Sequence, residues 1–390
     1  MADSRTDFQA PLSPAELDLI SDVTAFVDEG IDDDERFDAL SRRAFELQYD
    51  RVVPFRRLCD HRGVTPADLP AKAESAAAPW QRIPAVPVIA FRSQALHVTE
   101  PVEIFRSSGT TAGDALRSVH RHPFPELYRR VIDATFARHC LPESRLPESR
   151  LPGDEAKTRP MLSLIPPRQV IEDSSLGFMA DHVLRSHGDP SRTSVAMGAD
   201  GLDIDAAEAW VRSLDGEPGT VLTTAFALAF WLDGLEKADL RLELPPGSTL
   251  FETGGFKGRS RELTRSELLD AVELRLGLDR RSVVREYGMT ELTGHVYSDV
   301  LRGGDEDLFV VPPFIRVWMA DPETLQDVGL GKPGLVTFFD LANVGSCLHV
   351  TSQDLGVREE GGFRLLGRAD AAQLRGCSLT AEELSAPDMV

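Results

Sequence analysis

Residues 285–292 read REYGMTEL, and they follow the apolar run SVV at residues 282–284. The apolar run predicts a β-strand, and the polar residues after it predict a turn that carries Thr290 and Glu291. A carboxylate beside a hydroxyl at the end of a strand suits Mg²⁺ held on substrate phosphates. The same residues could instead begin a helix, because acidic side chains are favourable in a first helical turn. This stretch alone leaves both interpretations open.

Apolar, β-rich runs recur on both sides of this stretch and alternate with helical ones. The runs are MLSLI (161–165), TVLTTA (220–225), STLFE (248–252), SVVREY (282–287), GLVTFF (334–339) and CLHV (347–350). Before them, Leu17, Ile20, Val23 and Val27 recur at close to helical period, which predicts an N-terminal helix. Strands that alternate with helices predict an α/β fold in which helices cover the sheets.

Charge and cysteine usage exclude several classes of protein. The chain has 63 Asp and Glu residues against 42 Lys and Arg, a formal charge of −21, so its surface repels nucleic acid. We find no apolar run long enough to span a membrane and no signal peptide at the N-terminus. The four cysteines form no CxxC pair, which predicts reduced thiols in a cytoplasmic protein and no structural zinc.

A second polar stretch, FRSSGTTAGDALRS, occupies residues 105–118. Closely spaced glycines let successive backbone N–H groups face one anion, and hydroxyl side chains add donors. The stretch contains no lysine, so it is not the GxxxxGK[ST] nucleotide loop. It can be a phosphate-binding loop or an ordinary polar turn. The candidate ligands are Ser107, Ser108, Gly109, Thr110, Thr111 and Gly113.

Three later features are ambiguous when each is taken alone. LFETGGFKGRSRE, at residues 250–262, has adjacent glycines that allow a flat ligand to approach, followed by Lys257. Its alternative interpretation is a glycine turn with a solvated basic edge. Asp354 lies in a predicted loop after CLHV, and Arg368 follows a predicted strand in LLGRAD. Singly, each of these two charges would first be assigned to a surface ion pair.

Taken in order, these motifs resemble those of the adenylate-forming enzymes, the superfamily of acyl-CoA synthetases, luciferases and peptide-synthetase adenylation domains. A narrower resemblance is to the LuxE-type acyl-protein synthetases of bacterial fatty-acid reductase systems, and it spans roughly residues 45–384. The matching pieces are SSGTT, SSLGFM, LFETGGFKGRSRE, EYGMTEL and a final GR…LRGCSLT…EEL.

The resemblance implies the fold and the domain organisation. Residues 1–369 would form the large N-terminal domain of an adenylate-forming enzyme, with layered sheets and helices, and residues 370–390 would form a short tail. Other members carry a C-terminal lobe with a lysine that assists adenylation, whereas twenty residues follow Asp370 here and none is lysine. We therefore expect no coenzyme A site between two lobes, and we expect Lys257 to supply the missing positive charge.

The resemblance also implies roles for single residues. The hydroxyl-rich loop would hold the ATP phosphates, Thr290 would contact the α-phosphate, and Glu291 would bind Mg²⁺. Asp354 would bind the ribose hydroxyls, with Arg368 nearby at a pivot. The remaining nucleotide-binding candidates are Gly254 and Gly255 beside the adenine, and Tyr287 and Gly288 within the YGMTE motif.

Cys377, in RGCSL, corresponds to the acyl acceptor of the family. A thiol with an ordinary pKa is only about 3% thiolate at pH 7, so it needs activation or a very reactive acyl donor. An acyl-adenylate is such a donor, and the short tail would act as a moving arm. The alternative is that Cys377 is a small apolar residue that packs the tail against the domain.

The function implied is ATP-dependent activation of a carboxylic acid, expected to be a fatty acid, followed by its transfer to Cys377. The family's partner is an acyl-thioester reductase of the LuxC type, which carries the acyl group on to an aldehyde. Two alternatives are a ligase that passes the acyl group to coenzyme A or a carrier protein, and a catalytically silent binding or scaffold subunit. His120, His122 and His295 could contact substrate or serve packing alone.

Overall fold

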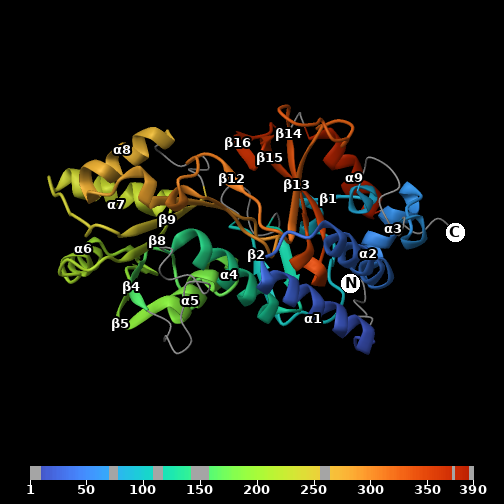
Figure 1. Ribbon diagram of the computed structural model, residues 1–390, viewed down its shortest axis with the longest axis horizontal. Coiled ribbons are helices and arrows are strands. Elements are labelled where there is room, and N and C mark those ends of the chain that lie inside the picture. Colours follow the sequence, from blue (N-terminus) through green and yellow to red (C-terminus); the bar gives the residue numbers. More distant parts are fainter. Residues whose placement is uncertain are drawn as a thin grey trace.

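A computed structural model describes residues 10–69, 78–108, 117–141, 158–254, 264–370 and 374–385. Within them, the chain forms one twelve-stranded sheet and two small two-stranded sheets, with helices on both sides (Figure 1). The small sheets pair β2 (Glu103–Arg106) with β3 (Val119–His122), and β6 (Met197–Gly198) with β7 (Gly201–Leu202). The predicted α/β fold is confirmed.

Five neighbouring strands of the large sheet run parallel. They are β5 (Gly188–Val195), β4 (Arg159–Ser163), β8 (Thr220–Thr224), β9 (Thr249–Thr253) and β10 (Val283–Tyr287). Helices α7 (Ala225–Lys237) and α8 (Arg265–Leu276) lie above β8 and β9 in Figure 1, and α4 (Pro125–Cys140) and α5 (Ser175–His187) lie below them. A further helix, α6 (Ile204–Arg212), packs with α7 and α8.

Side-chain alternation along these strands builds a core on each face. Val221, Leu250 and Val283 pack under α6, α7 and α8. Their sequence neighbours Leu222, Phe251 and Val284 pack under α4 and α5. Because successive strand residues point to opposite faces, a strand covered on both sides must be apolar throughout. This is why adjacent apolar pairs, Val221–Leu222, Leu250–Phe251 and Val283–Val284, lie at the centre of the runs TVLTTA, STLFE and SVVREY.

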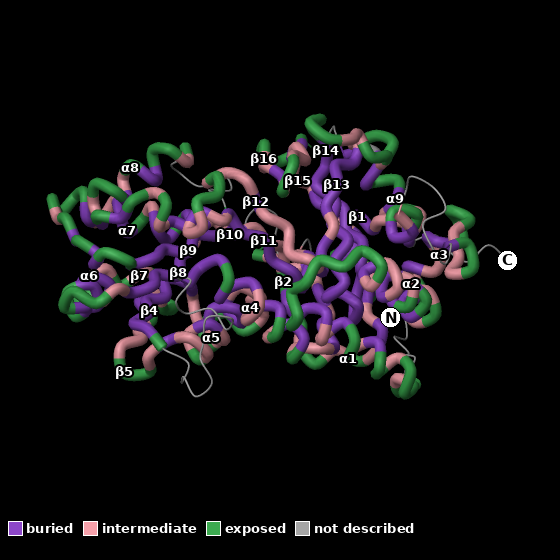
Figure 2. Tube along the Cα trace, in the orientation of Figure 1, coloured by how far each residue is buried: buried purple, intermediate pink, exposed green. Residues whose placement is uncertain are grey.

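The other strands of the large sheet are antiparallel, apart from β1, which pairs parallel with β15. They are β11 (Val296–Ser298), β12 (Phe309–Val310), β16 (Gly362–Arg368), β15 (His349–Glu359), β14 (Pro333–Asp340), β13 (Ile315–Ala320) and β1 (Val86–Pro87). The N-terminal helices α1 (Pro14–Glu29), α2 (Asp34–Arg51) and α3 (Val53–Arg62) share one core with these strands. Figure 2 shows β13 and β1 as buried segments between exposed outer turns.

The C-terminal residues differ from the predicted moving arm. Residues Arg375–Ser385 form helix α9, which packs on α3, β1 and the short helix η3 (Val88–Arg92). Leu374, Cys377 and Leu384 are buried, and their spacing places them on one helical face. Arg62 of α3 donates to Thr380 Oγ1 at 2.9 Å and pairs with Glu383 at 2.8 Å. Among the described helices, none is long and apolar enough to cross a bilayer.

Candidate functional site

The ends of β9 and β10 lie at the same edge of the sheet, because the two strands are parallel neighbours with Thr253 opposite Glu286. Gly254 follows β9 directly, and Tyr287 is the last residue of β10. Gly254 has φ of +81°, a conformation that favours glycine, and a Cβ atom there would meet no atom of the described residues within 4 Å. The structure therefore brings Gly254 and Tyr287 together at this edge.

Asp354 and Arg368 join this edge from the antiparallel strands. The two residues are register partners in β15 and β16, and the Tyr287 hydroxyl donates to Asp354 Oδ2 at 2.8 Å. Burial, followed by the Asp354 charge, raises the pKa of Tyr287 well above its ordinary value, so the phenol stays protonated and donates. Arg368 is exposed and donates to Gln353 Oε1 at 2.8 Å.

The prediction that Asp354 lies in a loop is wrong. The residue is within β15, which continues from His349 to Glu359 between β14 and β16. The polar run Thr351 to Asp354 hides this strand in the sequence, because it interrupts the apolar residues at Val350 and Leu355. Its neighbours on both sides supply the pairing that the local sequence does not indicate.

Thr290 and Glu291 lie in the turn after β10, as the REYGMTEL stretch predicts, rather than in a helix. The Glu291 side chain is only 5% exposed. Asp340 supports the end of this turn, because its Oδ2 accepts from the backbone N–H of Thr293 at 3.2 Å and of Gly294 at 2.7 Å. Burial raises the pKa of Asp340 to about 6.

Strand β3, which follows the hydroxyl-rich stretch, also reaches this turn. Ser107 and Ser118 close the base of that stretch, since the Ser118 N–H donates to Ser107 Oγ at 2.9 Å, and Ser108 is exposed. His120 follows Ser118 by two residues, and its Nδ1 lies 2.7 Å from the carbonyl oxygen of Thr290. The predictions for Gly109, Thr110, Thr111, Gly113, Gly255 and Lys257 lie outside the described residues.

His295 is paired rather than free. Its Nδ1 lies 2.9 Å from Glu286 Oε1, and its ring stacks on Tyr128 with a centroid separation of 5.6 Å. Thr253 Oγ1 donates to the other oxygen of Glu286. Gly288 leaves room for this pair, because a Cβ atom there would lie 2.5 Å from Glu286 Oε1 and 2.9 Å from His295 Nδ1. The glycine of the YGMTE motif thus has a steric reason in this structure.

Cys377 does not lie in a mobile tail but in the packed face of α9, where it is 1% exposed. Burial raises the pKa of its thiol to about 11, so little thiolate exists at pH 7 in this arrangement. Cys59, Cys140 and Cys347 are likewise buried, and all four thiols are free.

Two residues that hold the turn were not singled out by the sequence. Asn343, in the 3₁₀-helix η9 (Leu341–Gly345), donates to the carbonyl oxygen of Glu291 at 2.9 Å, and Asp340 precedes that helix. From the sequence alone, His120 and His122 are compatible with either substrate contact or packing. The signal available was the His-x-His spacing, which places both rings on one face of an extended strand.

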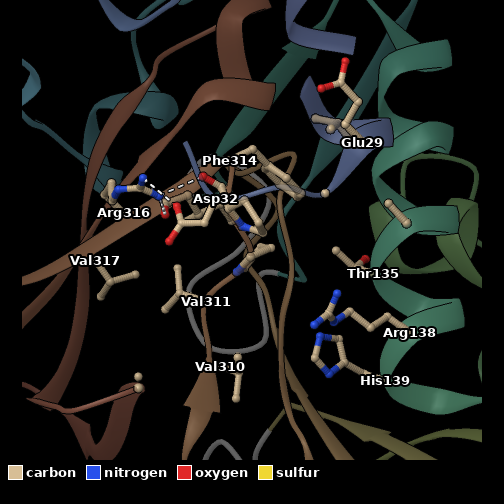
Figure 3. Close-up of a pocket in the computed structure, with 18 of the residues that line it drawn as sticks. Glu29, Asp32, Thr135, Arg138, His139, Val310, Val311, Phe314, Arg316 and Val317 are labelled. Atoms are coloured by element: carbon tan, nitrogen blue, oxygen red, sulfur yellow. Dashed lines mark hydrogen bonds and ion pairs between the residues drawn. The ribbon is translucent and has the colours of Figure 1, made fainter. Parts of the chain in front are cut away.

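A separate cavity of about 660 Å³ lies between α4, the end of α1 and the start of β13. In Figure 3, Arg138 and His139 project from α4 on one side, and Arg316 and Val317 lie on the other. Arg316 pairs with Asp32 at 3.0 Å and with Asp34 at 2.8 Å. Of the predicted site residues that the structure describes, none lines this cavity.

Buried histidines predict that the fold loses stability in mild acid. His120 and His349 have their pKa values lowered by burial to about 4, so below pH 6.5 the unfolded chain binds protons that the folded chain does not. Each then lowers the free energy of unfolding by about 2 kcal/mol between pH 7 and pH 5. Asp340, whose raised pKa acts with the opposite sign, returns about 1 kcal/mol.

These three groups together give an expected loss of roughly 2–3 kcal/mol over this interval, and His122, whose pKa burial lowers well below its ordinary value, adds to the loss. Urea unfolding at pH 7, 6 and 5 measures it. A free energy of unfolding that stays constant, or that rises toward pH 5, would contradict the expectation.

Comparison with solved structures gives the class of fold. An open conformation of 2-hydroxyisobutyryl-CoA ligase, in complex with 2-HIB-AMP and CoA, is 13% identical, with a TM-score of 0.61 over 87% of this chain and 70% of that chain. The postadenylation state of the same ligase is 14% identical, with a TM-score of 0.59 over 86% of this chain and 67% of that chain. The chain has the fold of the adenylate-forming enzymes.

The narrower match follows from the sequence. Residues 222–385 match the family model described as "Acyl-protein synthetase, LuxE". This range contains Gly254, Tyr287 to Glu291, Asp354, Arg368 and Cys377, and it begins after the hydroxyl-rich stretch. The family resemblance inferred from the motifs is confirmed over this range. None of the curated protein sequences matches the chain.

The match to the acyl-protein synthetase model is thus confined to residues 222–385, and the solved structures show the fold alone.

Proposed function

We propose that this chain converts a carboxylic acid and ATP into an acyl-adenylate and then transfers the acyl group to Cys377 as a thioester. The observation that carries the adenylation step is the hydrogen bond between Tyr287 and Asp354. It joins two motifs separated by 67 residues, and it places them beside Gly254 and the Thr290–Glu291 turn. A nucleotide site needs these groups at one edge of the sheet.

The residues at this edge fit a nucleotide. Asp354 uses one carboxylate oxygen toward Tyr287, and carboxylate oxygens have further lone pairs that can accept from the two ribose hydroxyls. Gly254 leaves open space where a flat base would approach. The phosphates would then extend toward Thr290 and the base of the hydroxyl-rich loop, which His120 brings together.

Glu291 fits the chemistry of Mg²⁺, because this ion is commonly held by one or two carboxylates, substrate phosphates and waters. A bound Mg²⁺ would neutralise charge on the phosphates during the reaction. The protein's contribution is to hold the carboxylate in a turn whose backbone is fixed by Asp340 and Asn343.

In the first step, an oxygen of the substrate carboxylate bonds to the α-phosphorus of ATP, and the bond to pyrophosphate breaks. In the second, the Cys377 sulfur, having lost its proton, bonds to the acyl carbon, and AMP leaves with the electron pair. The first step is useful because a carboxylate alone would have to expel oxide. Positioning of the charged groups supplies most of the acceleration in such transfers.

The second step requires that α9 leave the position described above, because a thiol that is buried with a raised pKa is inert. Cys377 follows Arg368 by nine residues. Nine extended residues span at most about 30 Å, which sets the reach of the sulfur from the edge of the sheet. The tether is therefore long enough for a considerable displacement of the helix.

The burial of the Cys377 thiol favours a second candidate function, in which the acyl-adenylate is passed to a diffusible thiol such as coenzyme A or a carrier protein. In the first candidate, the product thioester would be delivered to an acyl-thioester reductase of the LuxC type. A fatty acid is the substrate that the LuxE match favours. Four free cysteines are in keeping with a reducing cytoplasm.

The test is to incubate the purified protein with ATP, Mg²⁺ and radiolabelled acids that range from short to long chains. Pyrophosphate exchange that depends on the acid measures adenylation. Label that survives denaturation but is released by hydroxylamine measures the thioester. Exchange without covalent label would favour the diffusible acceptor, and the absence of both with every acid would reject the proposed function.

A further inference from the structure

Strand β3 presents two histidines to the turn that carries Glu291. His120 and His122 occupy alternate positions of this strand, so both rings lie on one face. His120 is fully buried and His122 is 4% exposed. Their two rings lie 5.1 Å apart, and the strand follows directly on the described end of the hydroxyl-rich stretch.

The direction of the first hydrogen bond is set by its acceptor. His120 Nδ1 lies 2.7 Å from the carbonyl oxygen of Thr290, and a carbonyl oxygen can only accept. His120 must therefore carry its proton on Nδ1. Burial lowers the pKa of His120 to about 4, so the ring is neutral and Nε2 is left without a proton.

The second bond is set through a short relay. The Asn343 side-chain nitrogen donates to two carbonyl oxygens, those of Glu291 at 2.9 Å and Cys347 at 2.6 Å, which fixes the orientation of the amide. Its oxygen therefore accepts from the Thr293 hydroxyl at 2.9 Å. That hydroxyl has then used its single proton, so His122 Nε2, 2.9 Å away, must donate to it.

The two histidines are thus opposite tautomers, and both act as donors to the same turn. His120 holds the carbonyl of Thr290 directly. His122 holds the carbonyl of Glu291 through Thr293 and Asn343. Two successive carbonyl groups of the turn are therefore fixed by donors that come from different parts of the chain.

We propose that His120 and His122 are positioning residues, which hold the Thr290–Glu291 turn in register with the strand that ends the hydroxyl-rich loop. Their importance for catalysis rests on the proposed function, whereas their effect on the turn does not. Fixing these carbonyls restricts the backbone on both sides of the Glu291 side chain, and a displacement of about 1 Å in such a group can lower a rate about a hundredfold.

The opposite tautomers allow a crossed test. The amide nitrogen of asparagine can take the place of an imidazole Nδ1, and the longer glutamine can take the place of Nε2. His120→Asn should therefore preserve the bond to Thr290, while His120→Gln should lose it. At the other position the order reverses, so His122→Gln should preserve the relay and His122→Asn should lose it.

Hydrogen exchange followed by mass spectrometry reads the turn without any assay of activity. The amides of Leu292, Thr293 and Gly294 donate within the turn or to Asp340. We expect these amides to exchange at least about tenfold faster in His120→Gln and His122→Asn than in the matched pair of variants that preserve the bonds, His120→Asn and His122→Gln. Peptides from β14 and β15 provide the reference for the whole fold. Thr293→Val, which removes the relay hydroxyl, should behave like His122→Asn.

A kinetic readout then connects the turn to catalysis. In acid-dependent pyrophosphate exchange, the two variants that lose a bond should show a kcat at least about tenfold lower, and the matched pair should stay within about threefold of wild type. The proposal is overturned if the turn amides exchange hydrogen equally fast in His120→Asn and His120→Gln, and equally fast in His122→Gln and His122→Asn. Peptides from β14 and β15 serve as the reference for these rates. If wild type lacks exchange activity, the proposed function fails, while the amide measurement still decides the role of the histidines.

Discussion

Replacing Cys377 by serine is expected to abolish the hydroxylamine-labile acyl label and to leave acid-dependent pyrophosphate exchange within about twofold of wild type. In the proposed function, adenylation involves the groups at the edge of the sheet, none of which belongs to α9. Serine keeps the shape of the side chain, but its hydroxyl is a far weaker nucleophile than a thiolate when no base activates it. This variant should therefore still adenylate the acid but form no thioester.

The control for this experiment is Cys347→Ser. Cys347 and Cys377 are each 1% exposed, so both substitutions place a hydroxyl in a buried position at a similar cost of about 1–3 kcal/mol. We expect the Cys347 variant to retain the label. Label that persists in Cys377→Ser would remove this residue as the acceptor. Loss of label in both variants, with lowered unfolding temperatures, would assign the effect to the fold.

The second large effect is expected from Glu291→Gln, which should lower acid-dependent pyrophosphate exchange by about 10²- to 10³-fold. The substitution keeps the size of the side chain and its place in the turn, but it removes the negative charge that suits Mg²⁺. Because the metal would neutralise charge on the phosphates, the loss should appear mainly in kcat, and raised Mg²⁺ should recover only part of it.

Glu208→Gln is the matched control, since Glu208 lies on α6, away from the edge of the sheet, and is 8% exposed. It pairs with Arg212 at the surface, and its loss should leave exchange unchanged. Exchange in Glu291→Gln within about threefold of wild type would contradict a role for Glu291 at the metal. Exchange lowered equally by both substitutions would point to a general loss of stability.

Local patterns were sufficient to predict the strands β4, β8, β9 and β10 and the turn after β10, although not β5. The runs around Val221, Leu250 and Val283 are apolar on both faces, and this character is visible in the sequence because the strands are covered on both sides. The polar residues that follow then mark the strand ends. The order of the motifs, through the family resemblance, added Tyr287, Asp354 and Arg368 to the predicted site. The structure brings these three residues together.

What escaped prediction depends on partners that are distant in the sequence. Asp354 is in a strand because β14 and β16 pair with it, although its own surroundings are polar. The support of the turn by His120 joins residues 170 positions apart, and the contact of Arg62 with Glu383 joins residues 321 apart. Such pairs follow from tertiary packing, and neither residue shows its role in the surrounding sequence.

The position of α9 on the core also determines how the thiol of Cys377, the proposed acceptor, responds to oxidants. Peroxide and disulfides react with thiolates that solvent can reach, and this sulfur is both buried and protonated in the packed helix. Cys59, Cys140 and Cys347 are buried as well. The folded molecule thus presents no sulfur on which sulfenic acid or glutathione adducts form readily, and the window for oxidative damage opens only while α9 is displaced.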